Sequence, residues 1–201
     1  MMPLDLPPQL QERVVCSIAA AAKYQLPANL VLAVAEQEGG KPGQWVRNTN
    51  GTHDVGAMQF NTAYLATELA RYGITPADVA AAGCYAYELA SWRLRMHIQN
   101  DRGDLWTKAA NYHSRTPYYN AIYRAQLMQR AAKWAAWLEA RFPTFDVTRG
   151  TASSPTTPAA SPLPTIQAAA RPPSRPQRVA AMGYAPRTIG YTPRTITAFA
   201  R

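Results

Sequence analysis

Several features that would mark common protein classes are missing from this chain of 201 residues. No uninterrupted apolar stretch approaches the roughly 20 residues that a transmembrane helix needs, so we expect no membrane span. The first residues lack a basic segment ahead of their apolar part, and Glu12 and Arg13 interrupt that part. We therefore expect no clear signal peptide in this sequence.

Residues that bind metals or activate nucleophiles are also scarce. The three histidines, His53, His97 and His113, belong to no HExxH motif and no Cys/His cluster, so we predict no metal site. Neither a glycine-rich phosphate loop nor a GxSxG motif is present. Metalloenzymes, nucleotide-dependent enzymes and serine hydrolases are disfavoured, and we expect no cofactor.

Charge is divided unevenly along the chain. Residues 147–201 contain seven arginines but no lysine and no acidic residue, so they carry +7 of the net charge of +9. Residues 1–146 are nearly neutral, which disfavours a nucleic-acid-binding surface on the folded part. Salt-sensitive DNA binding through the arginine-rich tail is left as a separate alternative.

The composition changes abruptly after Asp146. Nine of the 17 prolines lie beyond it, among Ser, Thr, Ala and Arg, so we predict a folded domain over residues 1–146 and a disordered tail over residues 147–201. The tail contains a near-repeat, GYAPRTI from residue 183 and GYTPRTI from residue 190. A proline in each unit excludes a coiled coil. A short recruitment motif and a duplicated spacer explain the repeat equally well.

Capping residues and prolines divide the domain into helices. We expect helices over residues 8–24, 27–38, 62–71, 76–100 with a break near Gly83, 104–113 and 117–141. On the last helix, five apolar side chains are available to pack: Ile122, Leu127, Trp134, Trp137 and Leu138. Residues 44–60 are not helical in pattern, and Asn50-Gly51 predicts a tight hairpin turn. The fold class is therefore mainly α with a small β-hairpin lobe.

Glu38 stands at the end of the second expected helix. Helical spacing directs it toward the apolar stripe that contains Leu30 and Val34, whereas Glu36 points away from that stripe. Burial and the negative end of the helix dipole both raise the pKa of a carboxyl group. A rise from ~4.3 to ~6 corresponds to about 2.3 kcal/mol and would make Glu38 a general acid. The alternative is a solvated glutamate at a frayed helix end.

The hairpin carries residues suited to a carbohydrate ligand. Asp54 can be presented at the edge of a cleft, Gly56 lets a ligand approach the backbone, and Gln59 can both donate and accept hydrogen bonds. The alternative for Asp54 is a residue that stabilises the turn.

Three segments, LVLAVAEQEGG, NTNGTHDVGAMQFNTAYL and AANYHSRTPYYNAIY, follow one another in the order seen in a known family. Over about residues 14–130 the chain resembles the lysozyme-like lytic transglycosylases, especially those that accompany conjugation and other type IV secretion systems. The resemblance implies a lysozyme-like α+β fold and peptidoglycan glycan strands as substrate. It also identifies Glu38 with the family's catalytic acid.

The resemblance further implies a set of substrate-binding residues. Gly56-Ala57-Met58-Gln59 matches a Gly-Leu-Met-Gln segment, and Asn111-Tyr112-His113 matches an Ala-Tyr-Asn segment. Tyr112 would hydrogen-bond the Glu38 carboxyl or the substrate. Gly39 departs from the serine common at that position, so a hydroxyl hydrogen bond is lost or made by another group. The expected substrate-binding residues are Asn48, Asp54, Gly56, Met58, Gln59, Asn61 and Tyr112.

The implied reaction breaks the β-1,4 bond between N-acetylmuramic acid and N-acetylglucosamine. In a transglycosylase Glu38 acts first as acid and then as base, and an anhydro sugar forms. Residues 48–61 are also similar to animal-type lysozymes, so hydrolysis with Asp54 as the second carboxylate, at ~5 to 5.5 Å, is the nearest alternative. A non-catalytic peptidoglycan-binding assembly factor is another.

In several relatives a cysteine of the first helix pairs with one of the middle helix, which corresponds to Cys16 and Cys84. Such a disulfide closes a loop of 67 residues, for which the chain-entropy model gives about 4 kcal/mol. A disulfide and a peptidoglycan substrate both imply a periplasmic protein. The tail would then contact components of a secretion or conjugation apparatus.

Overall fold

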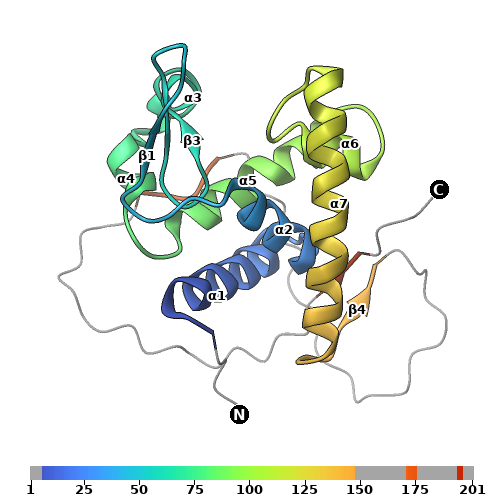
Figure 1. Cartoon of the computed structure of the whole chain (residues 1–201). Helices are drawn as coiled ribbons and strands as arrows, with labels where there is room; N and C mark the ends of the chain where they lie inside the picture. The colour runs from blue at the N-terminus through green and yellow to red at the C-terminus, as the bar shows by residue number, and fades with distance from the viewer. Residues whose placement is uncertain (1–5, 148–170, 176–193, 197–201) are drawn as a thin grey trace.

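The computed structural model describes residues 6–147, 171–175 and 194–196 (Figure 1). The rest of the tail, including the first GYAPRTI copy, lies outside the described residues. The main helices are α1 (Pro8–Lys23), α2 (Ala28–Glu38), α4 (Pro76–Ala80), α5 (Tyr85–Asn100), α6 (Leu105–Ala110) and α7 (Pro117–Glu139). The strands are β1 (Trp45–Arg47), β2 (His53–Val55), β3 (Phe60–Asn61), β4 (Phe145–Asp146) and β5 (Arg194–Thr195).

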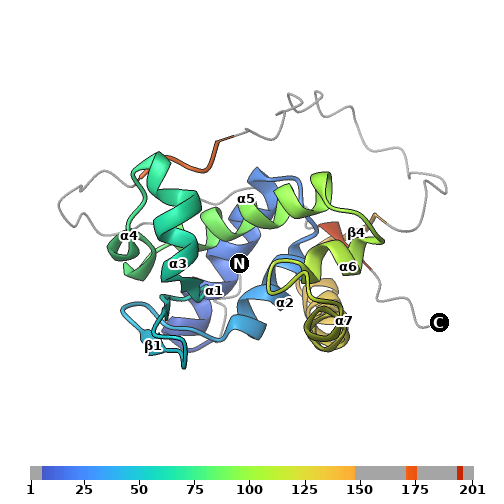
Figure 2. The same cartoon turned by 90° about the horizontal axis from the view of Figure 1, so that it is seen from above.

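Helix α2 forms the centre of the helical part. Residues 28–35 are all buried, and the helix packs against α1 and α7 (Figure 2). A helix that is apolar on every side is stable only when other elements surround it. Pro27 precedes its first turn, and Gly39 ends it in the left-handed conformation at φ 63°. The predicted bounds of this helix are confirmed.

Strands β1, β2 and β3 form a small antiparallel sheet that lies apart from α7 (Figure 1). Asp54 of β2 pairs with Val46 on one side and with Asn61 on the other. The hairpin turns at the expected Asn50-Gly51, but only Gly51 has a positive φ, at 83°. The Gly51 N–H donates to the Asn48 carbonyl at 3.1 Å, and the Asn48 N–H donates to the Thr52 carbonyl at 2.8 Å, so the hairpin turn is tight, as predicted.

The segment after β3 is helical as predicted, but it is not one regular helix. It runs through α3 (Thr62–Tyr64), a π-helical turn at Leu65–Leu69 and a 3₁₀ turn at Ala70–Tyr72. The Thr67 hydroxyl donates to the Ala63 carbonyl four residues earlier, and such side-chain bonds compete with the regular backbone pattern. Gly73 ends the segment with φ 72°.

A disulfide joins Cys16 in α1 to Cys84, the residue directly before α5. The implied cysteine pairing is therefore present. The break expected near Gly83 within residues 76–100 is confirmed, because α4 and α5 are separate helices with Gly83 in the turn between them. Since Cys84 lies at that turn, the disulfide fixes the start of α5 against α1.

Helix α7 presents a buried stripe to the domain. The stripe consists of Asn120, Tyr123, Leu127, Ala131, Trp134, Ala135 and Leu138. The expectation that Ile122 packs inward is wrong, because its side chain is 46% exposed. Tyr123, one position later, takes its place. The helices and the small sheet together give the expected α+β, lysozyme-like fold.

Two tail segments are exceptions to the expected disorder. The Arg175 guanidinium pairs with the Asp78 carboxylate at 3.0 Å. The strand β5 pairs in parallel with β4, and Ile196 is fully buried. Both segments are held by contacts with residues of the domain, and the composition of the tail alone does not predict these contacts.

Candidate active site

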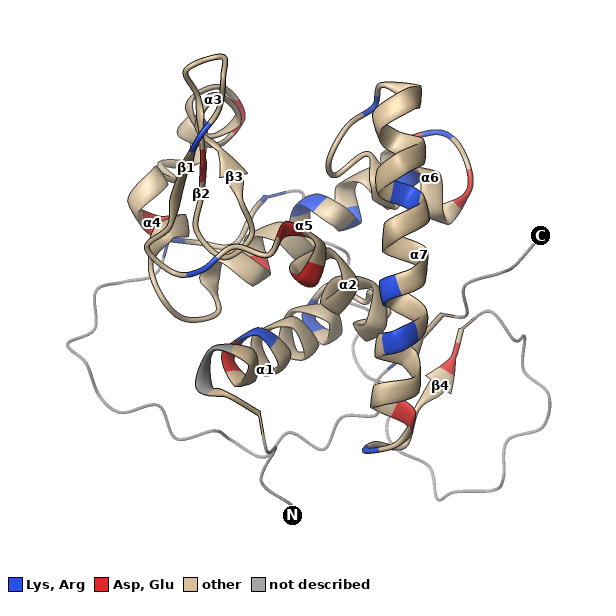
Figure 3. Ribbon diagram, viewed as in Figure 1, with Lys and Arg blue, Asp and Glu red and all other residues tan. Residues whose placement is uncertain are grey.

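Glu38 is the last residue of α2, and its side chain is partly buried. The acidic end of α2 lies between the strand lobe and α7 (Figure 3). From α7, the Tyr123 hydroxyl donates a hydrogen bond of 2.6 Å to Glu38 Oε1. This bond ties the candidate acid to the long helix on the opposite side of the site. It also replaces the hydroxyl hydrogen bond whose loss Gly39 suggested.

Burial raises the pKa of Glu38 from its ordinary value of 4.5 to about 7. The Tyr123 hydrogen bond and the positive charge of Arg93 oppose that rise, whereas the negative charge of Asp54 adds to it. The predicted direction is confirmed. A carboxyl group with a pKa near 7 can donate a proton and later accept one at neutral pH.

Glu36, two residues earlier, has different surroundings. Its Oε2 accepts a 2.7 Å hydrogen bond from the Trp134 indole, and its Oε1 lies 3.6 Å from Arg130 Nε. Glu36 therefore faces α7 as a charged structural partner. The two glutamates of α2 differ in environment, and only Glu38 meets a neutral hydroxyl donor.

Two glycines allow the backbone segments around Glu38 to come close together. A Cβ atom on Gly40 would lie 2.2 Å from the Gly56 carbonyl oxygen, and one on Gly56 would lie 2.0 Å from the Val79 oxygen. Gly56 is buried and has φ 74°. The expectation that Gly56 opens the backbone to a ligand is therefore wrong, because its free side faces α4.

Gln59 packs against the same two glycines, Gly40 and Gly56. Its backbone has φ 47°, unusual for a residue with a side chain, and its Nε2 donates to the Gly56 carbonyl at 2.8 Å. The same Nε2 would be 2.6 Å from a Cβ on Gly40. Gln59 therefore lies beside Gly40, two residues after α2 ends at Glu38.

In the strand lobe, Asp54 belongs to a hydrogen-bond network of polar side chains. The Asn61 amide donates to Asp54 Oδ1 and to the Thr52 hydroxyl, both at 2.9 Å. Asn48 donates to the same hydroxyl at 3.1 Å. Asn61 also caps α3, because its Oδ1 accepts from the Ala63 N–H. This hydrogen-bond network orients Asp54, whose negative charge raises the pKa of Glu38.

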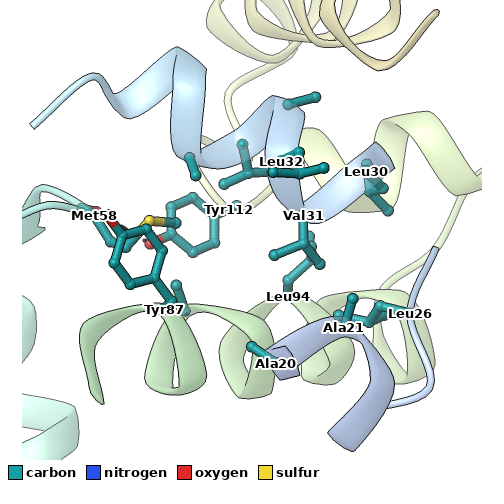
Figure 4. Close-up of a cluster of buried hydrophobic side chains, with 14 of the residues drawn as sticks. Ala20, Ala21, Leu26, Leu30, Val31, Leu32, Met58, Tyr87, Leu94 and Tyr112 are labelled. Atoms are coloured by element: carbon teal, nitrogen blue, oxygen red, sulfur yellow. Dashed lines mark hydrogen bonds between the residues drawn. The ribbon is translucent and has the colours of Figure 1, made fainter. Parts of the chain in front are cut away.

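Met58 and Tyr112 lie in the hydrophobic core. Met58 is 0% and Tyr112 is 3% exposed, and the two side chains lie beside each other in Figure 4. The Tyr112 hydroxyl donates to the Met58 carbonyl at 3.2 Å. The expected hydrogen bond from Tyr112 to Glu38 is wrong, because Tyr123 makes it. A substrate cannot reach the Met58 side chain without moving its neighbours.

Sequence reasoning missed two residues of the site, Tyr123 and Arg93. Tyr123 precedes Leu127 and Trp134 on the buried stripe of α7, so helical spacing counted from those residues would have identified it. Its ring stacks on the His113 ring at 4.9 Å between centroids. The Arg93 guanidinium lies 4.2 Å from the Tyr64 ring centroid and 4.6 Å from that of Tyr112, between two distant segments.

A hollow of about 490 Å³ lies along α5 and shares Arg93 with the surroundings of Glu38. Its polar wall is held by Asp101, which contacts His97 Nδ1 at 2.7 Å and accepts from Asn111 at 2.9 Å. The Asn120 amide of α7 donates to Asn111 at 2.8 Å. The residues lining the hollow are Tyr64, Thr67, Glu68, Trp92, Arg93, Met96, His97, Asn100, Asp101 and Arg115.

Within the described parts of the chain, no group of three His, Cys, Asp or Glu side chains is arranged to hold a metal ion. None of the helices described is both long and apolar enough to cross a bilayer.

No curated protein matches the chain. A family model described as the transglycosylase SLT domain matches residues 15–118, just over half of the chain. The match includes Glu38, the sheet, Gln59 and Arg93, and it ends shortly before Tyr123. The chain therefore belongs to the transglycosylase SLT domain family and is a peptidoglycan lytic transglycosylase.

Proposed function

We propose that Glu38 is the catalytic acid and then the catalytic base in cleavage of the β-1,4 bond between N-acetylmuramic acid and N-acetylglucosamine. The observation that carries the proposal is the Tyr123-bonded, partly buried carboxyl group whose pKa is about 7. Protonated Glu38 donates its proton to the glycosidic oxygen as the C1–O bond breaks. The resulting Glu38 carboxylate then takes the proton from the 6-hydroxyl of the N-acetylmuramic acid. The oxygen of that hydroxyl bonds to C1 of the same sugar and gives the anhydro product.

The proposed roles of the other residues follow their exposure. Asn48, Asp54, Gln59 and Asn61 are partly exposed, and we assign substrate hydrogen bonding to them. Gly56, Met58 and Tyr112 are buried, and we assign them the support of this surface from behind. Tyr123 positions the Glu38 carboxyl.

The nearest competing mechanism is hydrolysis with Asp54 as the second carboxylate. It is favoured by one observation, the hydrogen bond from Asn61 that orients Asp54 toward a fixed position in the lobe. The two mechanisms differ in product mass. Muropeptides from wild type that are one water lighter than hydrolytic products support the anhydro route, and ordinary reducing ends overturn it.

The Asp54→Asn variant separates the same mechanisms by rate. Under the transglycosylase proposal it keeps the anhydro product and most of the activity, because no second carboxylate takes part. Under the hydrolytic mechanism it loses activity by orders of magnitude.

Peptidoglycan lies outside the cytoplasmic membrane, so the enzyme acts in an extracytoplasmic compartment. We place it in the periplasm, where the Cys16–Cys84 disulfide is stable. We further propose that residues 1–146 form the transglycosylase domain and that the tail, residues 147–201, contacts a type IV secretion or conjugation apparatus. The seven arginines of the tail suit an acidic partner surface. Cross-linking from the tail in cells that assemble such an apparatus tests this association.

A further inference from the structure

The tail returns to the domain at the end of α7 that lies away from the strand lobe (Figure 1). There, β5 pairs in parallel with β4, with Asp146 opposite Thr195. The Val147 N–H donates to the Thr195 carbonyl at 3.0 Å. These tail residues are the last part of the second repeat copy, GYTPRTI. The contact is an added strand, a common way for proteins to bind an extended peptide.

Asn29 of α2 completes this contact from inside the domain. Its side chain is fully buried, and its Nδ2 donates to the Ile196 carbonyl at 2.7 Å and to the Ala131 carbonyl at 3.1 Å. Its Oδ1 accepts the Ile196 N–H at 2.9 Å. One amide side chain thus pairs with both backbone groups of Ile196, as a neighbouring strand would. We call Asn29, Ala131 and β4 the strand site.

The tail residues in the strand site are buried, and their loss would leave a buried polar atom of the site without its hydrogen-bond donor. Ile196 is 0% and Thr195 is 2% exposed, and Ile196 belongs to the main hydrophobic core. If the tail left, Asn29 Oδ1 would lose the donor that satisfies it inside the protein. A buried polar atom without a partner is costly, so an occupied site is strongly favoured over an empty one.

The tail carries a second sequence with the same recognition features. Residues 186–189 read Pro-Arg-Thr-Ile and are identical to residues 193–196. The contacts described above involve backbone atoms of Thr195 and Ile196 and the buried side chains of these two residues, all of which recur at Thr188 and Ile189. The strand site therefore has no evident means of distinguishing the copies.

We propose that the strand site is a binding site for a Pro-Arg-Thr-Ile strand and that the first copy can occupy it in place of the second. Docking of either copy closes a loop that starts at Asp146 of β4. The sequence separation is 49 residues from Asp146 to Thr195 of the second copy, and 42 residues from Asp146 to Thr188 of the first copy. Loop-closure entropy favours the shorter loop by only about 1.3-fold. The two copies are therefore near-equal competitors for one site.

Exchange of the copies changes what the tail offers to a partner. With the second copy bound, the GYAPRTI unit is undocked. With the first copy bound, the complete GYTPRTI unit is undocked instead. The repeat thus lets the tail stay anchored while one copy is released.

Hydrogen exchange at the Val147 N–H of the full chain tests the proposal, because this group donates to the docked copy. Three variants are compared with wild type: Ile189→Asp, Ile196→Asp and the double variant. A charge replaces the buried isoleucine, so each substitution prevents docking of its own copy. Ile189→Asp and Ile196→Asp should each keep the protection factor within about tenfold of wild type, and the double variant should lose about 100-fold or more.

Two results would overturn the proposal. Equal loss in Ile196→Asp and in the double variant would mean that the first copy does not bind. Full protection in the double variant would mean that the isoleucines do not hold the tail. The amide of Leu127 in α7 serves as the folding control, and Ile→Ser replaces Ile→Asp at both positions if that amide loses protection.

Peptides supply a second readout on the double variant. Added GYAPRTI peptide should restore protection at Val147, whereas the matched peptide ending in Asp should not. Restoration by both peptides, or by neither, would contradict recognition of the Pro-Arg-Thr-Ile strand.

Discussion

The Tyr123 hydroxyl lies 2.6 Å from Glu38 Oε1 and donates to it across the site, from α7 to the end of α2. Burial and the negative charge of Glu38 keep the pKa of Tyr123 well above its usual value, so Tyr123 stays a donor at any physiological pH. The hydrogen bond favours the carboxylate form and opposes the rise in the Glu38 pKa that burial causes. This pair of residues therefore helps to set the pH range of the acid.

Replacing Tyr123 with phenylalanine removes the hydrogen bond and keeps the ring. The Glu38 pKa should rise further, and the basic limb of the pH profile of kcat/KM should move up by about one pH unit. At pH 7 a larger fraction of Glu38 should then be protonated, so titration should not lower the activity there, because the acid step needs the protonated form and itself produces the carboxylate for the base step. Tyr118→Phe is the control, since Tyr118 is 69% exposed on the same helix. If the basic limb of the pH profile stays in place in Tyr123→Phe, the hydrogen bond does not affect the pKa of Glu38.

The raised pKa of Glu38 also makes a prediction about stability. The folded state holds the proton more tightly than the unfolded state, so the contribution of Glu38 is fully present below pH 4.5 and is lost as the pH rises through about 7. Relative to wild type, Glu38→Gln should gain about 3 kcal/mol in unfolding free energy between pH 4 and pH 8. Urea unfolding of both proteins measures the difference, in which the other titrating groups cancel. A constant difference across this range would rule out the raised pKa.

The packing of Gly56 against α4 predicts a large loss of stability in Gly56→Ala. The added Cβ would meet the Val79 carbonyl oxygen at 2.0 Å, and φ is 74°, so the loss should reach about 3 kcal/mol or more. Gly51→Ala is the matched control, because its φ is 83° but no atom lies within 4 Å of the added Cβ. It should cost about 1 kcal/mol. Equal melting temperatures of the two variants would contradict the packing.

The sequence was most informative where a local pattern decides the structure. Helical spacing placed Glu38 toward the interior, and Gly39 ends α2 where the pattern stops. The cysteine pairing came from the resemblance alone and is present. One local prediction was wrong in detail, because residues 62–71 were expected to form one regular helix and instead form α3, a π-helical turn and a 3₁₀ turn.

The rest of the site depends on contacts between distant segments. Tyr123 lies 85 residues from Glu38, and spacing within α7 gives its face but not its partner. Gly56 was assigned to a ligand because the sequence does not show that α4 packs against it. The docking of Ile196 depends on Asn29, 167 residues away, so the composition of the tail could not predict it.

The most direct test of the central claim compares Glu38→Gln with Glu36→Gln in the release of muropeptides from purified peptidoglycan. Both substitutions keep the shape of the side chain, and both remove a carboxyl from the same turn of α2. Glu38→Gln should lower the rate by about 1,000-fold or more, because the proton donor is lost, whereas Glu36→Gln should keep most of the activity. Equal activity in Glu38→Gln and wild type would contradict the assignment of Glu38 as the catalytic acid.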